Sequence, residues 1–312
     1  MILLRAYVVA TDDWELVQSD EVQECVKQIL ELYLRERFES SPTLLVPDAA
    51  FMIDRRMAVY GYPLEIQALY FGLLVSAREL LTNNGANAQI LENLNVLSEA
   101  LRDHLRVYYW LDRQRLSQRL NEMHRYYAEE FGLYVVNVLN VYPESIPDWM
   151  DGWLDSRCGY LVGNVGPGRI DFRYFAMGNL LAILFGLTTP AGSQGIMNLY
   201  QRHWRFSTGS DPKNVAWSYH NGGNWPVLVW PFIASALRTG RLELAEQALN
   251  LMTERLKADK WPEYYDGRNG GLVGRRANFY QVWSATGLII AHELMENPES
   301  RALFDKMLIN QG

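Results

Sequence analysis

Apolar residues at helical spacing recur along almost the whole chain, and this repetition constrains the fold more than any other feature. Within each stretch the apolar side chains return every three or four residues, which is the pattern of an amphipathic or buried helix. The stretches occupy residues 21–38, 63–81, 88–110, 172–187, 225–240, 241–258 and 278–295. The first residues, ILLRAYVVA, are typical of the second half of a further buried helix. No stretch indicates a strand ladder, so the sequence predicts an all-α protein.

The connections between these helices are of two kinds. Some are short, such as the Thr239-Gly240 stop between two predicted helices. Others are long and rich in aromatic, Gly, Asn, Asp and Arg residues; they occupy residues 41–63, 159–173, 208–225 and 261–276. In folds built from helix pairs, this alternation places bare turns on one face and functional loops on the other. The pattern is typical of an α/α barrel, here one domain over residues 1–312.

Composition excludes several classes of protein. The formal net charge is −7, whereas binding to nucleic acid by charge needs clustered Lys and Arg, so no nucleic-acid partner is expected. Cys25 and Cys158 are the two cysteines, too few for a disulfide framework and without metal-ligand spacing, which favours a cytoplasmic location. No apolar run approaches the length of a membrane-spanning helix, so no membrane partner is expected.

The long loops combine carboxylates with aromatic side chains, and Arg, Asn and His stand close by. Sugars are bound by such mixtures, because aromatic faces cover apolar C–H patches while carboxylates, amides and guanidinium groups hold the hydroxyls. Trp217, Trp225, Trp261 and Trp283 lie within or beside these loops. The loops therefore predict a carbohydrate cleft, although any one of these aromatics could instead pack between helices.

Glycoside hydrolysis commonly uses two carboxyl groups that flank the scissile bond, so loop carboxylates are the candidates. Asp54 lies in FMIDRRM, Asp171 in IDFR and Glu263 in WPEYYDG. Each has a structural alternative. Asp54 could form an ion pair with Arg55 or Arg56, Asp171 could be the N-cap of the following helix, and Glu263 could lie at an exposed helix end. We favour the N-cap for Asp171, with substrate contact as an added role.

Other chemistries find little support in the sequence. There is no G-x-S-x-G motif before a helix, and GNVGPG follows no predicted strand, so neither a serine hydrolase elbow nor a dinucleotide fingerprint is indicated. His220 is the single histidine within a loop, which leaves no histidine pair for a sugar epimerase and no group of metal ligands. No metal and no cofactor are expected.

Five long segments resemble the alkaline/neutral invertases of plants and cyanobacteria. They are SPTLLVPDAAFMIDRRMAVYGYPLEIQALY, YPESIPDWM, GYLVGNVGPGRIDFRYFAMGNLLAIL, SDPKNVAWSYHNGGNWPVLVW and WPEYYDGRNGGLVGRRANFYQVWSATG. The resemblance runs through almost the whole chain in the right order. It implies an (α/α)6 barrel that hydrolyses sucrose, or a similar disaccharide, without a metal or organic cofactor, and a homo-oligomer.

Residue by residue, the resemblance implies that Asp54 is the catalytic acid and Glu263 the second catalytic carboxylate. Because related helical-barrel hydrolases invert the anomeric centre, Glu263 is expected as a general base, with a nucleophile as the alternative. The implied substrate-binding residues are Arg55, Tyr60, Gln67, Asn164, Asp171, Arg173, Trp217, Tyr219, His220, Asn221 and Arg275.

The chain departs from the family pattern in two places. Relatives begin well before ILLRAY, and they carry an extra stretch between GIMNLYQ and HWRFSTGSDPKN. An α/α barrel without some of its helices exposes apolar faces, so the alternative function is an inactive, truncated relative that binds sugars or other subunits.

Overall fold

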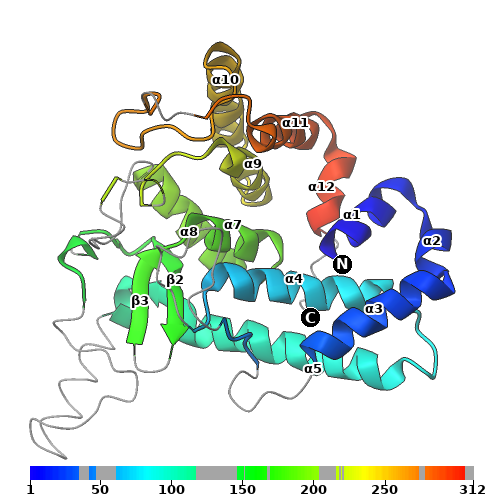
Figure 1. The fold of residues 1–312 in the computed structure, drawn as a ribbon. Helices are drawn as coiled ribbons and strands as arrows, with labels where there is room; N and C mark the ends of the chain where they lie inside the picture. The colour runs from blue at the N-terminus through cyan, green and yellow to red at the C-terminus, as the bar shows by residue number, and fades with distance from the viewer. Residues whose placement is uncertain are drawn as a thin grey trace, which may run out of the picture.

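The described part of the protein is mostly helical and contains one small sheet (Figure 1). The computed structural model describes residues 1–34, 42–46, 61–116, 146–150, 152–166, 169–203, 216, 217, 219, 221–273 and 278–305. The α-helices are α1 (Ile2–Thr11), α2 (Trp14–Gln18), α3 (Asp20–Tyr33), α4 (Leu64–Leu80), α5 (Ala88–His104), α7 (Ala176–Leu184), α8 (Pro190–Arg202), α9 (Val229–Arg238), α10 (Leu242–Ala258), α11 (Val282–Glu296) and α12 (Pro298–Asp305). The short turns and strands are η3 (Leu105–Tyr109), η6 (Asp148–Met150), η7 (Pro226–Leu228), β1 (Trp110–Asp112), β2 (Gly159–Gly166) and β3 (Arg169–Tyr174).

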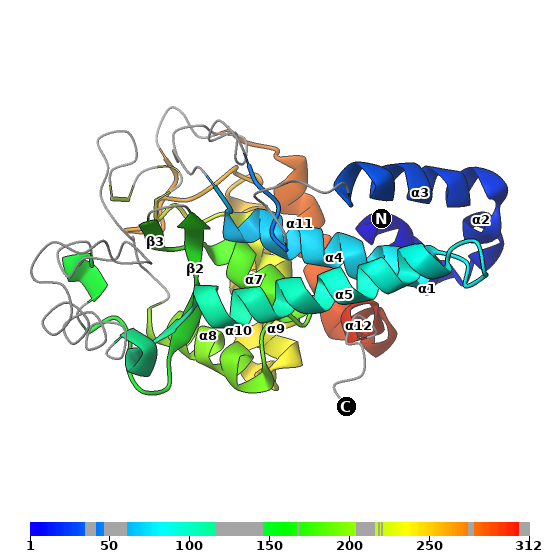
Figure 2. The ribbon, with the colours of Figure 1, turned by 90° about the horizontal axis from the view of Figure 1, so that it is seen from below.

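The helices contact one another in a closed series. α4 contacts α7, α7 contacts α9 and α9 contacts α11, and the series returns to α4 through α12 and α1 (Figures 1 and 2). α5 packs on α4, and α10 packs on α9. Side chains from the facing helices, among them Leu64, Leu181 and Ile233, are buried in one apolar core. The seven helices expected from periodicity are each present, with shifted ends.

α4 and α7 approach each other closely at a glycine. A Cβ atom on Gly178 would lie 2.7 Å from Cγ of Leu64, which is well inside van der Waals contact. α7 is buried along most of its length, in keeping with its nearly continuous apolar sequence AMGNLLAIL. Glycine at this position is therefore what allows the two helices to pack at this distance.

The expectation that the chain has no strands is wrong. β2 pairs antiparallel with both β1 and β3, and the order in the sheet is β1-β2-β3. The first six residues of β2 are buried, so both of its faces are covered. A strand covered on both faces loses the alternation of polar and apolar residues by which a strand is recognised. Residues 172–174 and Trp110, expected in helices, belong to this sheet.

The long loops of the chain lead into four helices that form the series. Residues 41–63 precede α4, residues 159–173 precede α7, residues 208–225 precede η7 and α9, and residues 261–276 precede α11. The described parts of these loops therefore lie at helix N-termini, whose partial positive charge favours acceptor groups. We call this side of the molecule the loop face; the sheet and the loop before α11 lie on it, at the left in Figure 1. Within the described residues, no helix is both long and apolar enough to cross a membrane.

Candidate functional site

Glu263 is buried on the loop face, and both of its carboxylate oxygens accept hydrogen bonds. Only 7% of the residue is exposed. The Tyr219 hydroxyl donates to Oε1 at 2.6 Å, and Nδ2 of Asn278 donates to Oε2 at 2.6 Å. The Glu263 backbone N–H also donates to the Asn278 carbonyl at 2.7 Å. The alternative of an exposed helix-end glutamate is therefore wrong, and the carboxylate is fixed in position from two sides.

The backbone around Glu263 is strained and tied down. Lys260, Trp261 and Tyr280 have φ angles of 60°, 56° and 57°, in the left-handed region that is costly for residues with side chains. The Tyr280 N–H donates to the Lys260 carbonyl at 2.9 Å, which joins two of these residues. In the first turn of α11, the buried Ser284 hydroxyl donates to the Pro262 carbonyl at 2.7 Å. The strain is thus concentrated where the chain positions one carboxylate.

Aromatic rings form a wall beside Glu263. Trp225 stacks on Tyr264 with ring centroids 5.2 Å apart, and Tyr219 meets both rings edge-on at 4.7 and 4.8 Å. Burial, followed by the nearby charges of Glu263 and Asp266, raises the pKa of Tyr264 above its usual value. These rings pack on one another and lie beside the carboxylate, and the carbohydrate cleft expected from the sequence stays a prediction.

Two glycine-containing loops meet behind this wall. Asn224 and Tyr265 form a backbone bridge, and a Cβ atom on Gly267 would lie 1.4 Å from the Gly222 carbonyl oxygen. Only glycine fits at such a distance. Asp266, three residues after Glu263, accepts hydrogen bonds from the backbone N–H of residues 268 and 269, so its carboxylate shapes a turn.

A second polar group lies on the sheet. Asn164 on β2 is 3% exposed, and its Oδ1 accepts from the Tyr62 backbone N–H at 2.6 Å, which joins the sheet to the loop before α4. Asp171 on β3 forms a salt bridge with Arg173, in which Nε contacts Oδ1 at 2.9 Å and Nη2 contacts Oδ2 at 2.5 Å. The expectation that Asp171 caps a helix is wrong, because α7 begins at Ala176 and its N-cap is Phe175, without a side-chain hydrogen bond.

Glu65 is a buried carboxyl group that no sequence pattern singles out. It is 5% exposed in the first turn of α4, and Oε2 has no hydrogen-bond partner among the described residues. Burial raises its pKa to about 8, and the hydrogen bonds from its own backbone and from Gly178 only partly oppose this rise. The charges of Asp171 and Arg173 act on it with opposite signs. At neutral pH Glu65 therefore carries its proton.

The other expected binding residues have varied surroundings. Gln67 is fully buried, and its amide exchanges two hydrogen bonds with the backbone of Leu44, at 2.8 and 2.9 Å. Trp217 is half-buried with φ 67°, and its backbone N–H donates to the backbone carbonyl of the buried Asn221 at 2.7 Å. The remaining expected site residues lie outside the described residues: Asp54, Arg55, Tyr60, His220 and Arg275.

Among the described residues, Tyr219 contacts Glu263, Trp217 contacts Asn221, and Asn164 pairs in the sheet with Asp171, which binds Arg173. The structure adds Asn278 and Glu65, which the sequence analysis missed. Asn278 lies two residues after Arg276, and no sequence pattern there marks a carboxylate partner. No group of three or more His, Cys, Asp or Glu residues within the described ranges could hold a metal ion.

Comparison with known proteins agrees with the resemblance noted from the sequence. The family model described as "Alkaline and neutral invertase" matches residues 1–205 and 199–298, two segments that meet where an internal deletion is expected. The chain is 45% identical over 319 residues to alkaline/neutral invertase CINV1 of Arabidopsis thaliana, covering 96% of this chain and 57% of that protein. It is 44% identical over 319 residues to cytosolic invertase 1 of Oryza sativa subsp. japonica (96% and 56%). It is 41% identical over 320 residues to neutral/alkaline invertase 1, mitochondrial, of the same rice (96% and 50%).

The chain thus spans 50–57% of the length of these relatives, whose names place them in different compartments. Family membership rests on the length and identity of these matches, which cover nearly all of the chain. The chain belongs to the alkaline and neutral invertase family.

Proposed function

We propose that the protein is a glycoside hydrolase that cleaves sucrose to glucose and fructose on an (α/α)6 barrel. The observation that carries this proposal is the environment of Glu263. A buried carboxylate that is fixed by Tyr219 and Asn278 and bordered by stacked aromatic rings suits a sugar-cleaving site. We infer sucrose as the substrate from family membership, since the relatives are named invertases.

In the proposed reaction, Glu263 acts as general base. It removes a proton from a water molecule whose oxygen attacks the anomeric carbon, while Asp54 donates a proton to the glycosidic oxygen that leaves. The hydrogen bonds from Tyr219 and Asn278 hold the Glu263 oxygens in one orientation, so that a free lone pair stays directed at the water. The role of Asp54 rests on the family resemblance alone. A separation of the two carboxyl groups of about 6.5–9.5 Å would fit this inverting course, and about 5–5.5 Å a nucleophilic one.

The substrate would be bound by residues on the loop face. Asn164 and the Asp171–Arg173 pair offer amide, carboxylate and guanidinium groups to sugar hydroxyls, and the Tyr264 and Trp225 rings offer faces to C–H patches. The proposed binding residues remain those expected from the resemblance: Arg55, Tyr60, Gln67, Asn164, Asp171, Arg173, Trp217, Tyr219, His220, Asn221 and Arg275. No metal or cofactor takes part in this proposal, and the active form would be a homo-oligomer.

The test is glucose release from sucrose by the purified chain. Glu263→Gln and Asp54→Asn keep the size of each side chain while removing its acid–base function, and each should lower the rate at least a thousandfold. Glu92→Gln on the exposed face of α5 is the matched control and should keep the rate of the wild type. Full activity in either site variant would contradict the role assigned to that residue. Sugar binding without any hydrolysis by the wild type would favour the inactive, sugar-binding alternative.

A further inference from the structure

A cavity of about 620 Å³ lies near the start of β2. Its wall is built from the segment around β1, the turn before β2 and the start of α8, which contacts β2 (Figure 2). Four arginines line it: Arg106, Arg113, Arg115 and Arg157. We call this space the arginine cavity. Asp112 is the one acidic residue among those that line it, so the lining carries four positive charges and one negative charge.

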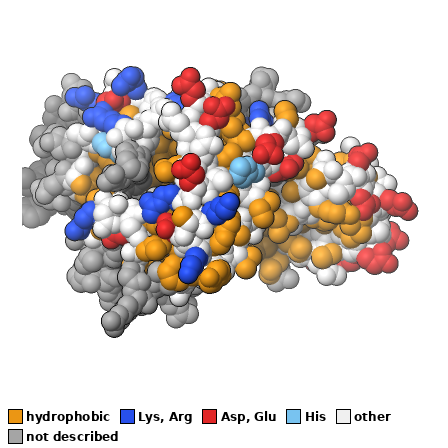
Figure 3. All heavy atoms as spheres, turned by 90° about the horizontal axis from the view of Figure 1, so that it is seen from above, with side chains coloured by type: hydrophobic (Ala, Val, Ile, Leu, Met, Phe, Trp, Pro, Cys, Tyr) orange, Lys and Arg blue, Asp and Glu red, His pale blue; other side chains and the backbone are white. Residues whose placement is uncertain are grey.

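This concentration of arginine runs against the charge of the whole chain, which is −7. Exposed acidic side chains also lie on α5 and α10, and a group of six lies over α1 to α3, on the right in Figure 3. The six are Asp12, Glu15, Asp20, Glu21, Glu24 and Glu31. The positive charge in the arginine cavity is therefore a local feature of the fold.

The single carboxylate of the cavity is held by neutral donors. Oδ2 of Asp112 accepts from Nε1 of Trp110 at 2.8 Å, and Oδ1 accepts from the Arg115 backbone N–H at 2.7 Å. Within the described residues it forms no ion pair with the guanidinium groups around it. Asp112 thus fixes the indole ring and a turn and does not pair with the arginines, whereas Asp155, outside the lining, lies 3.6 Å from Arg157.

The four arginines divide into two fixed and two movable groups. Arg106 donates from Nε to the Leu187 carbonyl at 2.7 Å, and Arg115 donates from Nη1 to two backbone carbonyls at 2.8 and 2.9 Å. Arg113 is exposed and forms no hydrogen bond or ion pair within the described part of the chain. The Arg157 side chain is 81% exposed and lies 3.6 Å from Asp155, a weak surface contact. The fixed pair supplies rigid positive charge, and the movable pair can turn toward a ligand.

The rest of the wall suits a small anion with an apolar or sugar-like part. α8 begins at the cavity, where Thr189, Ala191 and Gly192 line it, and a helix N-terminus carries partial positive charge. The Trp110 ring also lines the space; it lies against Gly159, where a Cβ atom would come within 2.4 Å of the ring. Glycine on that side leaves the indole room to sit flat along the wall.

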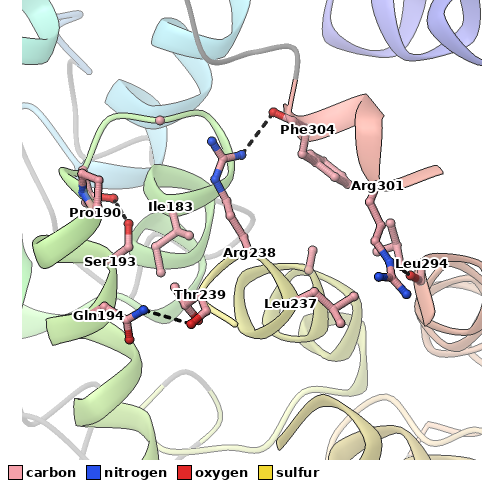
Figure 4. A pocket seen from close by; sticks show the side chains of 13 residues that line it. Ile183, Pro190, Ser193, Gln194, Leu237, Arg238, Thr239, Leu294, Arg301 and Phe304 are labelled. Atoms are coloured by element: carbon pink, nitrogen blue, oxygen red, sulfur yellow. Dashed lines mark hydrogen bonds between the residues drawn. The ribbon is translucent and has the colours of Figure 1, made fainter. Parts of the chain in front are cut away.

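A neighbouring cavity shows what structural arginines look like in this protein. It has a volume of about 450 Å³ and lies between the C-terminal ends of α7, α9 and α11 (Figure 4). Arg238 there donates to the Leu184 and Phe304 carbonyls, and Arg301 donates to the Leu294 and Met295 carbonyls. Capping of helix ends explains both. No such contact explains Arg113 and Arg157.

We propose that the arginine cavity binds a phosphate group, either as inorganic phosphate or as part of a phosphorylated sugar. Guanidinium groups match phosphate oxygens with paired hydrogen bonds, and the volume lies in the usual range for small-molecule sites. The Trp110 ring would cover the C–H face of an attached sugar. None of the residues that line this cavity is among those proposed to bind the uncharged sugar substrate.

The experiment is isothermal titration of the 312-residue chain with inorganic phosphate, with glucose 6-phosphate and with glucose, at constant pH and salt. The variant Arg113→Glu reverses one charge of the cavity, and Lys257→Glu reverses an exposed charge on α10 as the matched control. Because a hydrogen bond to a charged group contributes on the order of tenfold or more in affinity, Arg113→Glu should weaken binding at least tenfold, and Lys257→Glu less than twofold. If Arg113→Glu does not fold, Arg157→Gln tests the same expectation.

The two ligands distinguish the sources of the phosphate group. Equal affinity for phosphate and glucose 6-phosphate supports a site for the ion, and tighter binding of glucose 6-phosphate supports a site for a phosphorylated sugar. Absence of saturable binding of both would overturn the proposal. Equal weakening by Arg113→Glu and Lys257→Glu would also overturn it, because binding would then follow overall charge. Equally tight binding of uncharged glucose would do the same.

Discussion

The buried carboxyl group of Glu65 makes the stability of the protein depend on pH in a defined direction. Its pKa rises from 4.5 to about 8 in the folded protein because burial removes it from water. Below pH 4.5 the folded and unfolded chains both carry the proton. Between 4.5 and about 8 only the folded chain carries it, so the unfolded chain binds fewer protons and the free energy of unfolding falls as the pH rises.

The size of this effect follows from the two pKa values. One proton of difference changes the free energy of unfolding by about 1.4 kcal/mol per pH unit. From pH 5 to pH 8 this amounts to about 4 kcal/mol. Glu65→Gln keeps the size of the side chain, stays neutral at every pH and therefore lacks this loss. The difference in the free energy of unfolding between the variant and the wild type should grow in favour of the variant, by about 1 kcal/mol or more per pH unit.

Urea unfolding at pH 5, 6, 7 and 8 measures this difference. Glu92→Gln, an exposed carboxylate on α5, is the control, and its difference from the wild type should not change with pH. Parallel curves for Glu65→Gln and the wild type across this range would refute the reasoning, since Glu65 would then be ionised in the folded protein. The side chain would in that case have found a partner or water that the buried Oε2 lacks.

Three further substitutions test the loop face. Asn278→Ala removes the donor to Glu263 Oε2 and should lower the free energy of unfolding by about 1–2 kcal/mol, since water partly replaces the lost donor. Glucose release should fall more than tenfold. Unchanged values of both would show that the contact does not fix the carboxylate. Gly267→Ala should lower the melting temperature by several degrees, because its Cβ atom would meet a carbonyl oxygen at 1.4 Å. Gly85→Ala, whose Cβ atom would meet no atom within 4 Å, is the control and should leave the melting temperature unchanged. Equal melting temperatures of the two variants would contradict this expectation. Gln67→Ala removes both hydrogen bonds to Leu44, so hydrogen exchange at the Leu44 amide should become at least tenfold faster, and protection equal to the wild type would argue against this anchoring role.

The helices could be predicted from the sequence because the spacing of apolar residues within each helix indicates which of its sides is buried. In α4 and α10 the apolar residues return at the helical period, and that spacing depends only on which side of the helix faces the core. The loop face could be predicted for a similar reason, since long loops with aromatic and charged residues precede four of the helices. Glu263 stood out within such a loop, although the partners that hold its carboxylate did not.

The sequence by itself determined the helices, the loops that carry polar chemistry and the family to which the chain belongs. Only the tertiary structure decided that β2 is a strand, because burial of both faces removes the alternation that marks one. It alone decided that Asn278, 15 residues beyond Glu263, returns to hold the carboxylate, since the return depends on left-handed residues on both sides of the loop. Nothing in the local sequence distinguishes Glu65 from other glutamates in a first helical turn. Its burial comes from the close approach of α7 at Gly178.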